Sequence, residues 1–269
     1  MIYEYRELSE STPELGVPLK RFSLIAENID DMPRVAVLGK FNHGKSSLLN
    51  ALMDEDLFSV ADQRETREIT DFVRDNIRWV DAPGLGADLE GMDDKKAHQA
   101  ATEQADILML VHAINTGELD REECQLFNQA LRQDYNLAAK VVVVLTRVDQ
   151  LSTSDLSTSI SAIKQQLPDV RIFETSAIRY AKGNEMDKQV LVDKSGIPDL
   201  RSYLKEMSEG VFSLRIREAQ RLIRKMRSEA LSQREHYEKE KTTSEYELSH
   251  LDSQLQKNLD HIVEKFELD

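Results

Sequence analysis

Residues 34–53 constrain the fold of this chain more than any other stretch. They read RVAVLGKFNHGKSSLLNALM, in which an apolar, strand-like run is followed by the motif G-x-x-x-x-G-K-S at Gly39–Ser46 and then by a helix-like run. In this context the glycines let successive backbone amides point at phosphate oxygens, and the N-terminus of the following helix adds positive partial charge. The stretch therefore predicts a strand, a phosphate-binding loop and a helix.

The pattern of charged and apolar residues divides the chain into three zones. Residues 1–31 are acidic and carry a short helical pattern that ends near Asn28. Residues 32–209 alternate β-branched runs with amphipathic stretches, which is typical of a parallel α/β sheet flanked by helices. We therefore expect an N-terminal helical segment, an α/β domain with a mainly parallel sheet of roughly six strands, and a C-terminal α-helical extension over residues 210–269.

Strand-like and helix-like runs alternate through the central zone. The expected strands are Arg34–Leu38, Glu68–Val73, Arg78–Asp81, Ile107–Ile114, Lys140–Leu145 and Arg171–Glu174. The expected helices are Lys45–Met53, Lys95–Ala105, Arg121–Arg132, Ser154–Gln166 and Ile197–Met207. This alternation favours parallel strands joined by helical crossovers.

The third zone contains no glycine or proline after Gly210. Its polar stretch EKEKTTSE, between Tyr237 and Tyr246, is a candidate corner. One long helix and two helices folded back on each other are both compatible with this sequence. We expect a helical hairpin or coiled-coil extension and favour the hairpin. An apolar stripe at helical spacing supports helix here and consists of Leu248, Leu251, Leu255, Leu259, Ile262 and Phe266.

The chain is acidic, with 49 Asp and Glu against 35 Lys and Arg and a formal net charge of −14. Nucleic acid is therefore a disfavoured partner, because broad phosphate-backbone binding needs clustered basic residues. The single cysteine, Cys124, excludes an internal disulfide framework and indicates a reducing, intracellular compartment. The sequence shows no signal peptide and no apolar run that could span a bilayer. We expect a cytoplasmic protein, with peripheral binding to a membrane left open.

The phosphate loop supplies the first candidate binding residues. Lys45 should reach the β- and γ-phosphates of a nucleotide, and the Ser46 hydroxyl should bind Mg²⁺. His43 is expected to contribute only its backbone amide, with no role for its side chain. The expected nucleotide contacts in this stretch are Gly39, Asn42, His43, Gly44, Lys45, Ser46 and Ser47.

Two later motifs each follow an apolar strand. In Asp81-Ala-Pro-Gly84, the Asp81 carboxylate can hold the hydration shell of Mg²⁺ and the Gly84 amide can contact the γ-phosphate. In Thr146-Arg147-Val148-Asp149, the Asp149 carboxylate can accept hydrogen bonds from N1–H and the exocyclic amine of guanine. Adenine lacks this donor pair, so Asp149 predicts selection of guanine.

A last motif follows the sixth expected strand, where Ser176 precedes Ala177, whose backbone amide can meet the carbonyl oxygen of guanine. The ordered set GKFNHGKS, a Thr-bearing switch, DAPG, TRVD and TSA resembles the guanine-nucleotide domain of translation-factor-class GTPases. Within them it is most similar to the Era, MnmE and dynamin-like branch, over about residues 32–209. The resemblance implies a P-loop GTPase domain that hydrolyses GTP to GDP and phosphate with Mg²⁺ and acts as a conformational switch.

The resemblance also assigns the threonine of the switch. Thr66 lies in the segment RETRE, which is similar to the T-T-R-D segment of MnmE-like proteins, so it is expected to bind Mg²⁺ and contact the γ-phosphate. Thr70 is the alternative, although it lies in the strand-like run ITDFV. Arg147 stands where the family usually has Lys, and its aliphatic stem is expected to pack along the base.

Leu85 stands where Ras-like proteins have a Gln that orients the attacking water, and its side chain cannot form that hydrogen bond. In the resembling family, an Asn at the position of Asn42 helps to bind a K⁺ ion that takes the place of an arginine finger. We therefore expect hydrolysis that is stimulated by K⁺ and linked to a homodimer through the switch face. The alternative is that Asn42 only forms a turn. The expected catalytic residues are Lys45, Thr66, Gly84 and Asn42.

The remaining features leave alternatives open. The six histidines show no paired metal spacing, and His112 is expected to be a hydrogen-bonded strand residue. Seven basic residues lie among apolar ones between Arg215 and Arg234, so the helical tail is a candidate surface for a protein partner or an anionic membrane. A solvated helix face is the alternative. The leading hypothesis is a GTPase, and its rival is a GTP-dependent interaction module with negligible hydrolysis.

Overall fold

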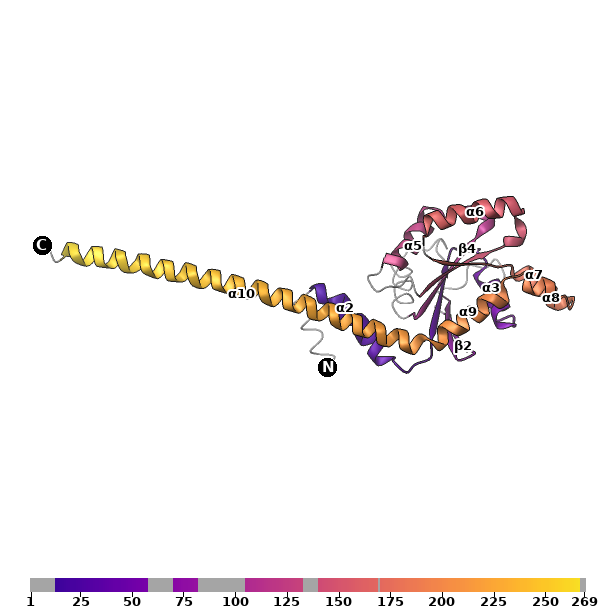
Figure 1. Ribbon diagram of the computed structural model, residues 1–269, viewed down its shortest axis with the longest axis horizontal. Coiled ribbons are helices and arrows are strands. Elements are labelled where there is room, and N and C mark those ends of the chain that lie inside the picture. The colour runs from indigo at the N-terminus through magenta and orange to yellow at the C-terminus, as the bar shows by residue number, and fades with distance from the viewer. Residues whose placement is uncertain (1–12, 58–69, 82–104, 133–139, 169, 267–269) are drawn as a thin grey trace. The chain divides into compact units, whose positions relative to one another are not determined.

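The chain forms two compact units in the computed structural model, which describes residues 13–57, 70–81, 105–132, 140–168 and 170–266. One unit is Glu27–Glu218, and the other combines Met1–Ala26 with Ala219–Asp269. The first unit holds the sheet and the motifs described above (Figure 1).

A six-stranded sheet with the strand order β2-β3-β1-β4-β5-β6 forms the centre of this unit. Its strands are β1 (Arg34–Gly39), β2 (Thr70–Arg74), β3 (Ile77–Asp81), β4 (Ile107–Ala113), β5 (Val141–Thr146) and β6 (Arg171–Glu174). Strand β2 runs antiparallel to β3, and all other neighbours are parallel, with Val35 of β1 opposite Trp79 of β3 and Ile107 of β4. The mainly parallel sheet of roughly six strands is thus confirmed.

Helices cover both faces of the sheet, with α3 and α9 on one side and α5 and α6 on the other (Figure 1). The helices of this unit are α3 (Lys45–Met53), α5 (Arg121–Arg132), α6 (Thr153–Gln166), α7 (Ala177–Glu185), α8 (Gln189–Asp193), α9 (Ile197–Glu209) and the start of α10 (Val211–Phe266). Two 3₁₀ turns, η1 (Ile114–Thr116) and η3 (Val148–Gln150), follow β4 and β5.

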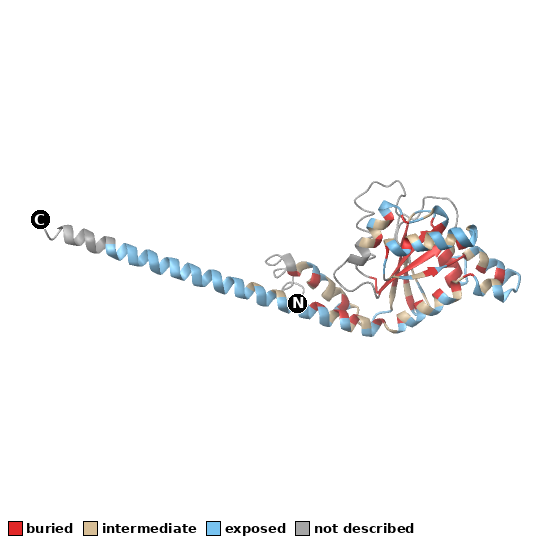
Figure 2. Cartoon of the chain, turned by 45° about the horizontal axis from the view of Figure 1, so that its top comes forward, coloured by how far each residue is buried: buried red, intermediate tan, exposed pale blue. Residues whose placement is uncertain are grey.

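Strands β4 and β5 are buried along their whole length, as the red interior in Figure 2 shows. Strands β4 and β5 have neighbours on both edges and helices on both faces, which is why they are almost unbroken apolar runs. At the edge of the sheet, Asp75 and Asn76 join β2 to β3 with φ of 51° and 59°, the left-handed conformation that a two-residue hairpin turn requires.

The sequence prediction missed two helices of this unit. Helices α7 and α8 lie in a stretch for which the sequence pattern predicts no element. Helix α7 begins because the Ser176 hydroxyl accepts a hydrogen bond from the amide of Arg179 at 3.0 Å and so caps its first turn. The helix expected over Lys95–Ala105 lies, except for Ala105, outside the described residues.

The favoured hairpin over residues 210–269 is wrong, because α10 continues without a break from Val211 to Phe266. The polar stretch expected to form a corner suits the surface of a helix. The Thr242 hydroxyl donates to the carbonyl of Glu238 at 2.8 Å, and Lys241 lies 3.8 Å from Glu245 one turn later. Polarity alone therefore does not end a helix when neither glycine nor proline is present. A coiled-coil partner for α10 stays a prediction.

The second unit pairs helix α2 (Pro13–Glu27) with the part of α10 that follows Glu218. Leu15 and Leu222 are buried there, whereas α10 is exposed over most of its described length (Figure 2). The apolar side chains of Leu248, Leu251 and Leu255 are among the exposed ones. No helix in the described part of the chain is long and apolar enough to cross a membrane.

Two buried ion pairs attach the first turns of α10 to the amino ends of β4 and β5. The guanidinium of Arg215 donates to both carboxylate oxygens of Asp106, at 2.9 and 2.6 Å, and to backbone carbonyls of residues 28–32. Lys140 pairs with Glu218 in the same region. Arg215 therefore does not belong to the basic surface expected for the tail, because it is only 4% exposed.

The substitution R215A tests this attachment. It is expected to lower the free energy of unfolding by about 3–5 kcal/mol, because Asp106 would stay buried without its charged partner. Urea denaturation followed by circular dichroism measures the change. Arg217 is exposed two residues later, so R217A should lower the free energy of unfolding by less than about 0.5 kcal/mol. Equal losses for the two variants would contradict the attachment.

Candidate functional site

The phosphate loop connects β1 to α3 at the carboxyl edge of the parallel sheet. Gly39 is required at its start, because a Cβ there would lie 2.3 Å from the carbonyl oxygen of Val111 in β4. The loop then turns through two left-handed residues, Asn42 with φ 63° and Gly44 with φ 82°. These conformations bring the chain back so that α3 starts at Lys45.

The Lys45 side chain folds back across the phosphate loop. Its ammonium group donates to the carbonyl oxygens of Gly39 and Lys40, both at 3.0 Å. Ser46 and Ser47 follow in the first turn of α3, where backbone amides without a helical partner face outward along the helix axis. The loop thus offers an ammonium, hydroxyls and a helix N-terminus at one place, which is a site for an anion.

The loop that follows β5 is hydrogen-bonded to the phosphate loop. The buried Thr146 hydroxyl lies 2.7 Å from the carbonyl oxygen of His43 and 3.3 Å from that of His112. The next residue, Arg147, has φ 60°, and its guanidinium donates to the carbonyl of Asn42 at 2.5 Å. Arg147 was expected only to pack its stem along a base, and in the structure its charged end also holds the phosphate loop.

The residues expected to contact guanine lie in two neighbouring loops. Asp149 is exposed in the turn η3, directly after β5. Ala177 is the first residue of α7, directly after the N-cap Ser176. The two loops are joined because the amide of Val148 donates to the carbonyl of Thr175 at 3.4 Å. Asp149 and Ala177 are therefore placed on linked loops beside the phosphate loop.

Glycine at position 196 packs α9 against the loop before α7. Gly196 has φ 71°, and a Cβ there would lie 1.9 Å from the carbonyl oxygen of Glu174.

A cavity of ≈ 370 Å³ opens between α3 and α7, and both Ser47 and Ala177 line it. Two members of the expected nucleotide set, 130 positions apart in the sequence, thus share one cavity.

Several expected site residues cannot be placed. Thr66, Gly84 and Leu85 lie outside the described residues. Asp81 ends β3 and pairs with Val37 of β1, but its side chain is not described. The alternative switch residue Thr70 begins β2 opposite Asp81, which agrees with its expected place in the sheet.

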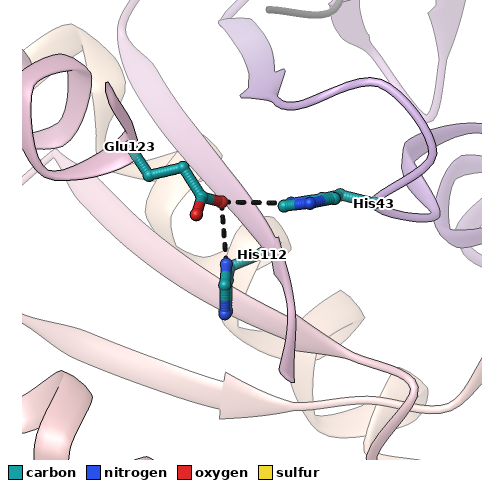
Figure 3. A group of neighbouring side chains, drawn as sticks. All are labelled: His43, His112 and Glu123. Carbon is teal, nitrogen blue, oxygen red and sulfur yellow. Dashed lines mark hydrogen bonds and ion pairs between the residues drawn. The ribbon is translucent and has the colours of Figure 1, made fainter. Parts of the chain in front are cut away.

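His43 has a side-chain contact that sequence reasoning missed (Figure 3). Its ring is buried, and its Nδ1 lies 3.1 Å from Oε1 of Glu123 in α5, at an angle that departs from that of a hydrogen bond. The same oxygen lies 2.7 Å from Nδ1 of His112. The two rings meet edge to face, with their centroids 5.4 Å apart. The His43 side chain thus has buried contacts that the sequence analysis did not predict.

His112 is hydrogen-bonded within this cluster, as expected for a buried strand residue. Its Nε2 lies 3.0 Å from the carbonyl oxygen of Gly117, so both ring nitrogens face oxygen acceptors. Both contacts are at hydrogen-bond distance, so they fix the orientation of the His112 ring beside Glu123. Burial raises the pKa of Glu123, but His112 and His43 outweigh this effect and lower that pKa to about 2.

The two histidines and Glu123 are metal-ligating residue types, and their ligand atoms all lie within 4.8 Å of one another. A tetrahedral zinc site with bonds near 2.1 Å separates its ligand atoms by about 3.4 Å. The 2.7 Å between His112 and Glu123 is shorter than this and is a hydrogen-bond distance. We therefore interpret the group as a charged, hydrogen-bonded cluster.

Residues 34–147 match the family model described as 50S ribosome-binding GTPase. An uncharacterized protein of Acinetobacter baylyi is 42% identical over 192 residues, which cover 71% of this chain and 46% of that protein. GTPase Der of Deinococcus deserti is 30% identical over 165 residues, which cover 57% of this chain and 36% of that protein. The chain thus spans less than half the length of these curated relatives.

Two bacterial dynamins are similar in structure. One belongs to an oligomerised bacterial dynamin pair, with a TM-score of 0.56 at 18% identity over 94% of this chain and 49% of that chain. The other is the LeoA bacterial dynamin GTPase from ETEC, with a TM-score of 0.51 at 15% identity over 84% of this chain and 45% of that chain. At these identities the likeness shows the fold alone. Residues 34–147 thus match a GTPase-domain model, and the sheet has the P-loop GTPase fold.

Proposed function

We propose that this chain binds GTP and GDP and hydrolyses GTP to GDP and phosphate, so that it acts as a conformational switch. The observation that carries the proposal is the pair of hydrogen bonds between the phosphate loop and the loop after β5. Thr146 and Arg147 donate to the carbonyls of His43 and Asn42, at 2.7 and 2.5 Å. A cradle for phosphates and a carboxylate suited to guanine are thereby held side by side.

Guanine selection is assigned to Asp149. Its carboxylate offers two acceptor oxygens, which match N1–H and the exocyclic amine of guanine. It is exposed at the carboxyl end of β5, and the amide of Ala177 on the linked loop is assigned to the guanine carbonyl oxygen. Arg147 joins the loop after β5 to the phosphate loop. This hydrogen bond supports a fixed distance between the proposed sites of the base and of the phosphates.

Mg²⁺ is assigned to Ser46, Thr66 and Asp81. Hydroxyl and carboxylate oxygens are ligands that Mg²⁺ prefers, and Ser46 follows Lys45, whose ammonium lies on the same loop. When bound, Mg²⁺ neutralises charge on the β- and γ-phosphates. Lys45 is assigned to the same phosphates, and Thr66 and the Gly84 amide are assigned to the γ-phosphate.

Catalysis is assigned to a K⁺ ion at Asn42, because Leu85 cannot orient water. The backbone carbonyl of Asn42 already accepts from Arg147, and the residue is exposed at the turn of the loop. Its side-chain oxygen is therefore the group that we assign to K⁺. The cation would offset the charge that develops between the β- and γ-phosphates, as a homodimer forms through the switch face.

The output of the switch is assigned to α10, whose first turns are attached to the sheet by Arg215 and Glu218. The similar bacterial dynamin pair is oligomerised and provides a mechanism for the long-range sensing and tethering of membranes. We propose that α10 carries the interaction with a partner chain or a membrane surface, with the protein located in the cytoplasm. Single-turnover hydrolysis separates this switch from an interaction module that binds GTP without cleaving it.

D149N is expected to weaken GTP and GDP binding by about tenfold to hundredfold, because one charged acceptor of the guanine donor pair is lost. Calorimetric titration with each nucleotide in the presence of Mg²⁺ measures the affinities. D252N, on the exposed surface of α10, is the matched control and should bind as the wild type does. Unchanged affinity in D149N would remove the assignment, and competition by ATP as strong as by GTP would contradict guanine selection.

T66A is expected to leave GDP affinity unchanged and to slow GTP hydrolysis by about tenfold or more, because Thr66 is assigned to the γ-phosphate that GDP lacks. Phosphate release under single-turnover conditions measures the rate. T70A provides the matched control, since Thr70 lies in β2. A slow T70A beside a normal T66A would transfer the role to Thr70.

Potassium is expected to raise the turnover of GTP at least about tenfold over sodium, because the cation replaces an arginine finger. Turnover is compared in KCl and NaCl of equal ionic strength over a range of protein concentrations. N42A should turn over equally slowly in both salts. Identical wild-type rates in KCl and NaCl at every protein concentration would contradict the assignment of a potassium site.

A further inference from the structure

The N-terminal end of α5 is attached to the phosphate loop by side chains. Lys40 forms ion pairs with Asp120 and with Glu122, the latter at 2.9 Å. His43 approaches Glu123 at 3.1 Å. Two residues of the phosphate loop thus contact one short stretch that lies about 80 positions later in the chain, and the family motif includes neither contact.

Glu123 connects three elements through its two carboxylate oxygens. Its Oε1 faces the Nδ1 atoms of His43 in the phosphate loop and His112 in β4, at 3.1 and 2.7 Å. Its Oε2 lies 3.2 Å from the amide of Asp120, while the Asp120 carboxylate accepts from the amide of Glu123 at 3.0 Å. This reciprocal pair caps α5 and fixes the backbone that carries the carboxylate.

The burial of Glu123 leaves its carboxylate little freedom to move. The residue is only 2% exposed, and a buried charge is tolerated only where it is paired and hydrogen-bonded. His112 and His43 together lower the pKa of Glu123, so the carboxylate stays ionised. The negative charge of Glu123 is therefore fixed next to the His43 ring of the phosphate loop.

His43 is held at both its side chain and its backbone. Its ring lies against Glu123 and His112, and its carbonyl oxygen accepts from the Thr146 hydroxyl at 2.7 Å. The next residue, Gly44, has φ 82° and leads directly to Lys45 at the start of α3. His43 is thus fixed by its side chain and its backbone directly before the left-handed turn that leads to Lys45.

We propose that Glu123 is a positioning residue for the nucleotide phosphates: through His43 it holds the phosphate loop in the conformation that points the amides of residues 43–46 at the phosphate oxygens. The inference rests on the proposed nucleotide binding at this loop. Glu123 acts on the part of the loop assigned to the β-phosphate, which both nucleotides have. Its loss is therefore expected to weaken the binding of GDP and GTP alike. The positioning role does not require the γ-phosphate or the switch residues.

A double-mutant cycle on His43 and Glu123 tests this role. E123Q removes the negative charge, and H43L removes the ring nitrogen while keeping an apolar side chain of similar size. Each is expected to lower GDP affinity about tenfold, because the phosphate loop loses its contact with the charged carboxylate of α5. The double variant should bind no more weakly than the weaker single variant. Affinities that multiply to about a hundredfold loss would overturn the coupling.

A conservative variant and two controls separate positioning from simple loss of stability. H43Q keeps an N–H donor and should recover most of the GDP affinity that H43L loses. E118Q changes an exposed carboxylate that faces Gln166 of α6 instead of the phosphate loop, and it should bind GDP normally. E218Q changes an equally buried carboxylate at the opposite edge of the sheet, so it should lower the melting temperature without changing GDP affinity.

These measurements distinguish the positioning role from the proposed function. Wild-type protein that binds no GDP would refute nucleotide binding itself. Wild-type protein that binds GDP, together with an E123Q that loses melting temperature but keeps its GDP affinity, would overturn only the positioning role. If E123Q does not fold, the comparison of H43L with H43Q decides, because equal GDP affinity in the two would also overturn it. Zinc bound stoichiometrically by the wild type and lost in H43L would replace positioning with a metal site.

Discussion

The hydrogen bonds from Thr146 and Arg147 to the phosphate loop are the interactions on which the rest of the site depends. A parallel sheet brings the carboxyl ends of its strands to one edge, but it does not fix the loops that leave those ends. Here β1 and β5 are separated by β4, and the loops after them are joined because Thr146 and Arg147 donate to carbonyls of residues 43 and 42. These bonds therefore help to fix the loop of Lys45 relative to the loop of Asp149.

The opposite edge of the same sheet holds the start of α10. Arg215 with Asp106 and Lys140 with Glu218 are buried pairs at the amino ends of β4 and β5. Strands β4 and β5 thus end in the phosphate site on one edge and in a charged attachment on the other. Buried pairs of this kind tolerate little displacement, because separating them leaves charge without a partner. The strands therefore form a rigid connection between the predicted nucleotide site and the helix.

The sequence predicted what local pattern determines. All six strands were anticipated from short runs rich in apolar and β-branched residues, and α3 and α5 have the predicted bounds because glycine and polar residues delimit them. The hairpin prediction was wrong because it treated a polar stretch as a helix breaker, although polar residues without glycine or proline continue an exposed helix. His43 was misjudged for a different reason. Its partners, His112 and Glu123, lie 69 and 80 positions away, and no spacing rule connects them.

The phosphate loop is constrained from two sides. Thr146 and Arg147 hold its carbonyls from the β5 side, while Glu123 and Asp120 contact its side chains from α5. The loop also uses two left-handed residues and a glycine with no room for a Cβ, and such a conformation persists only when its surroundings determine it. A loop fixed in this way loses little freedom when an anion binds, so more of the interaction energy appears as affinity. The contacts from the β5 side and from α5, which the sequence motifs do not record, therefore limit how far the phosphate loop can rearrange.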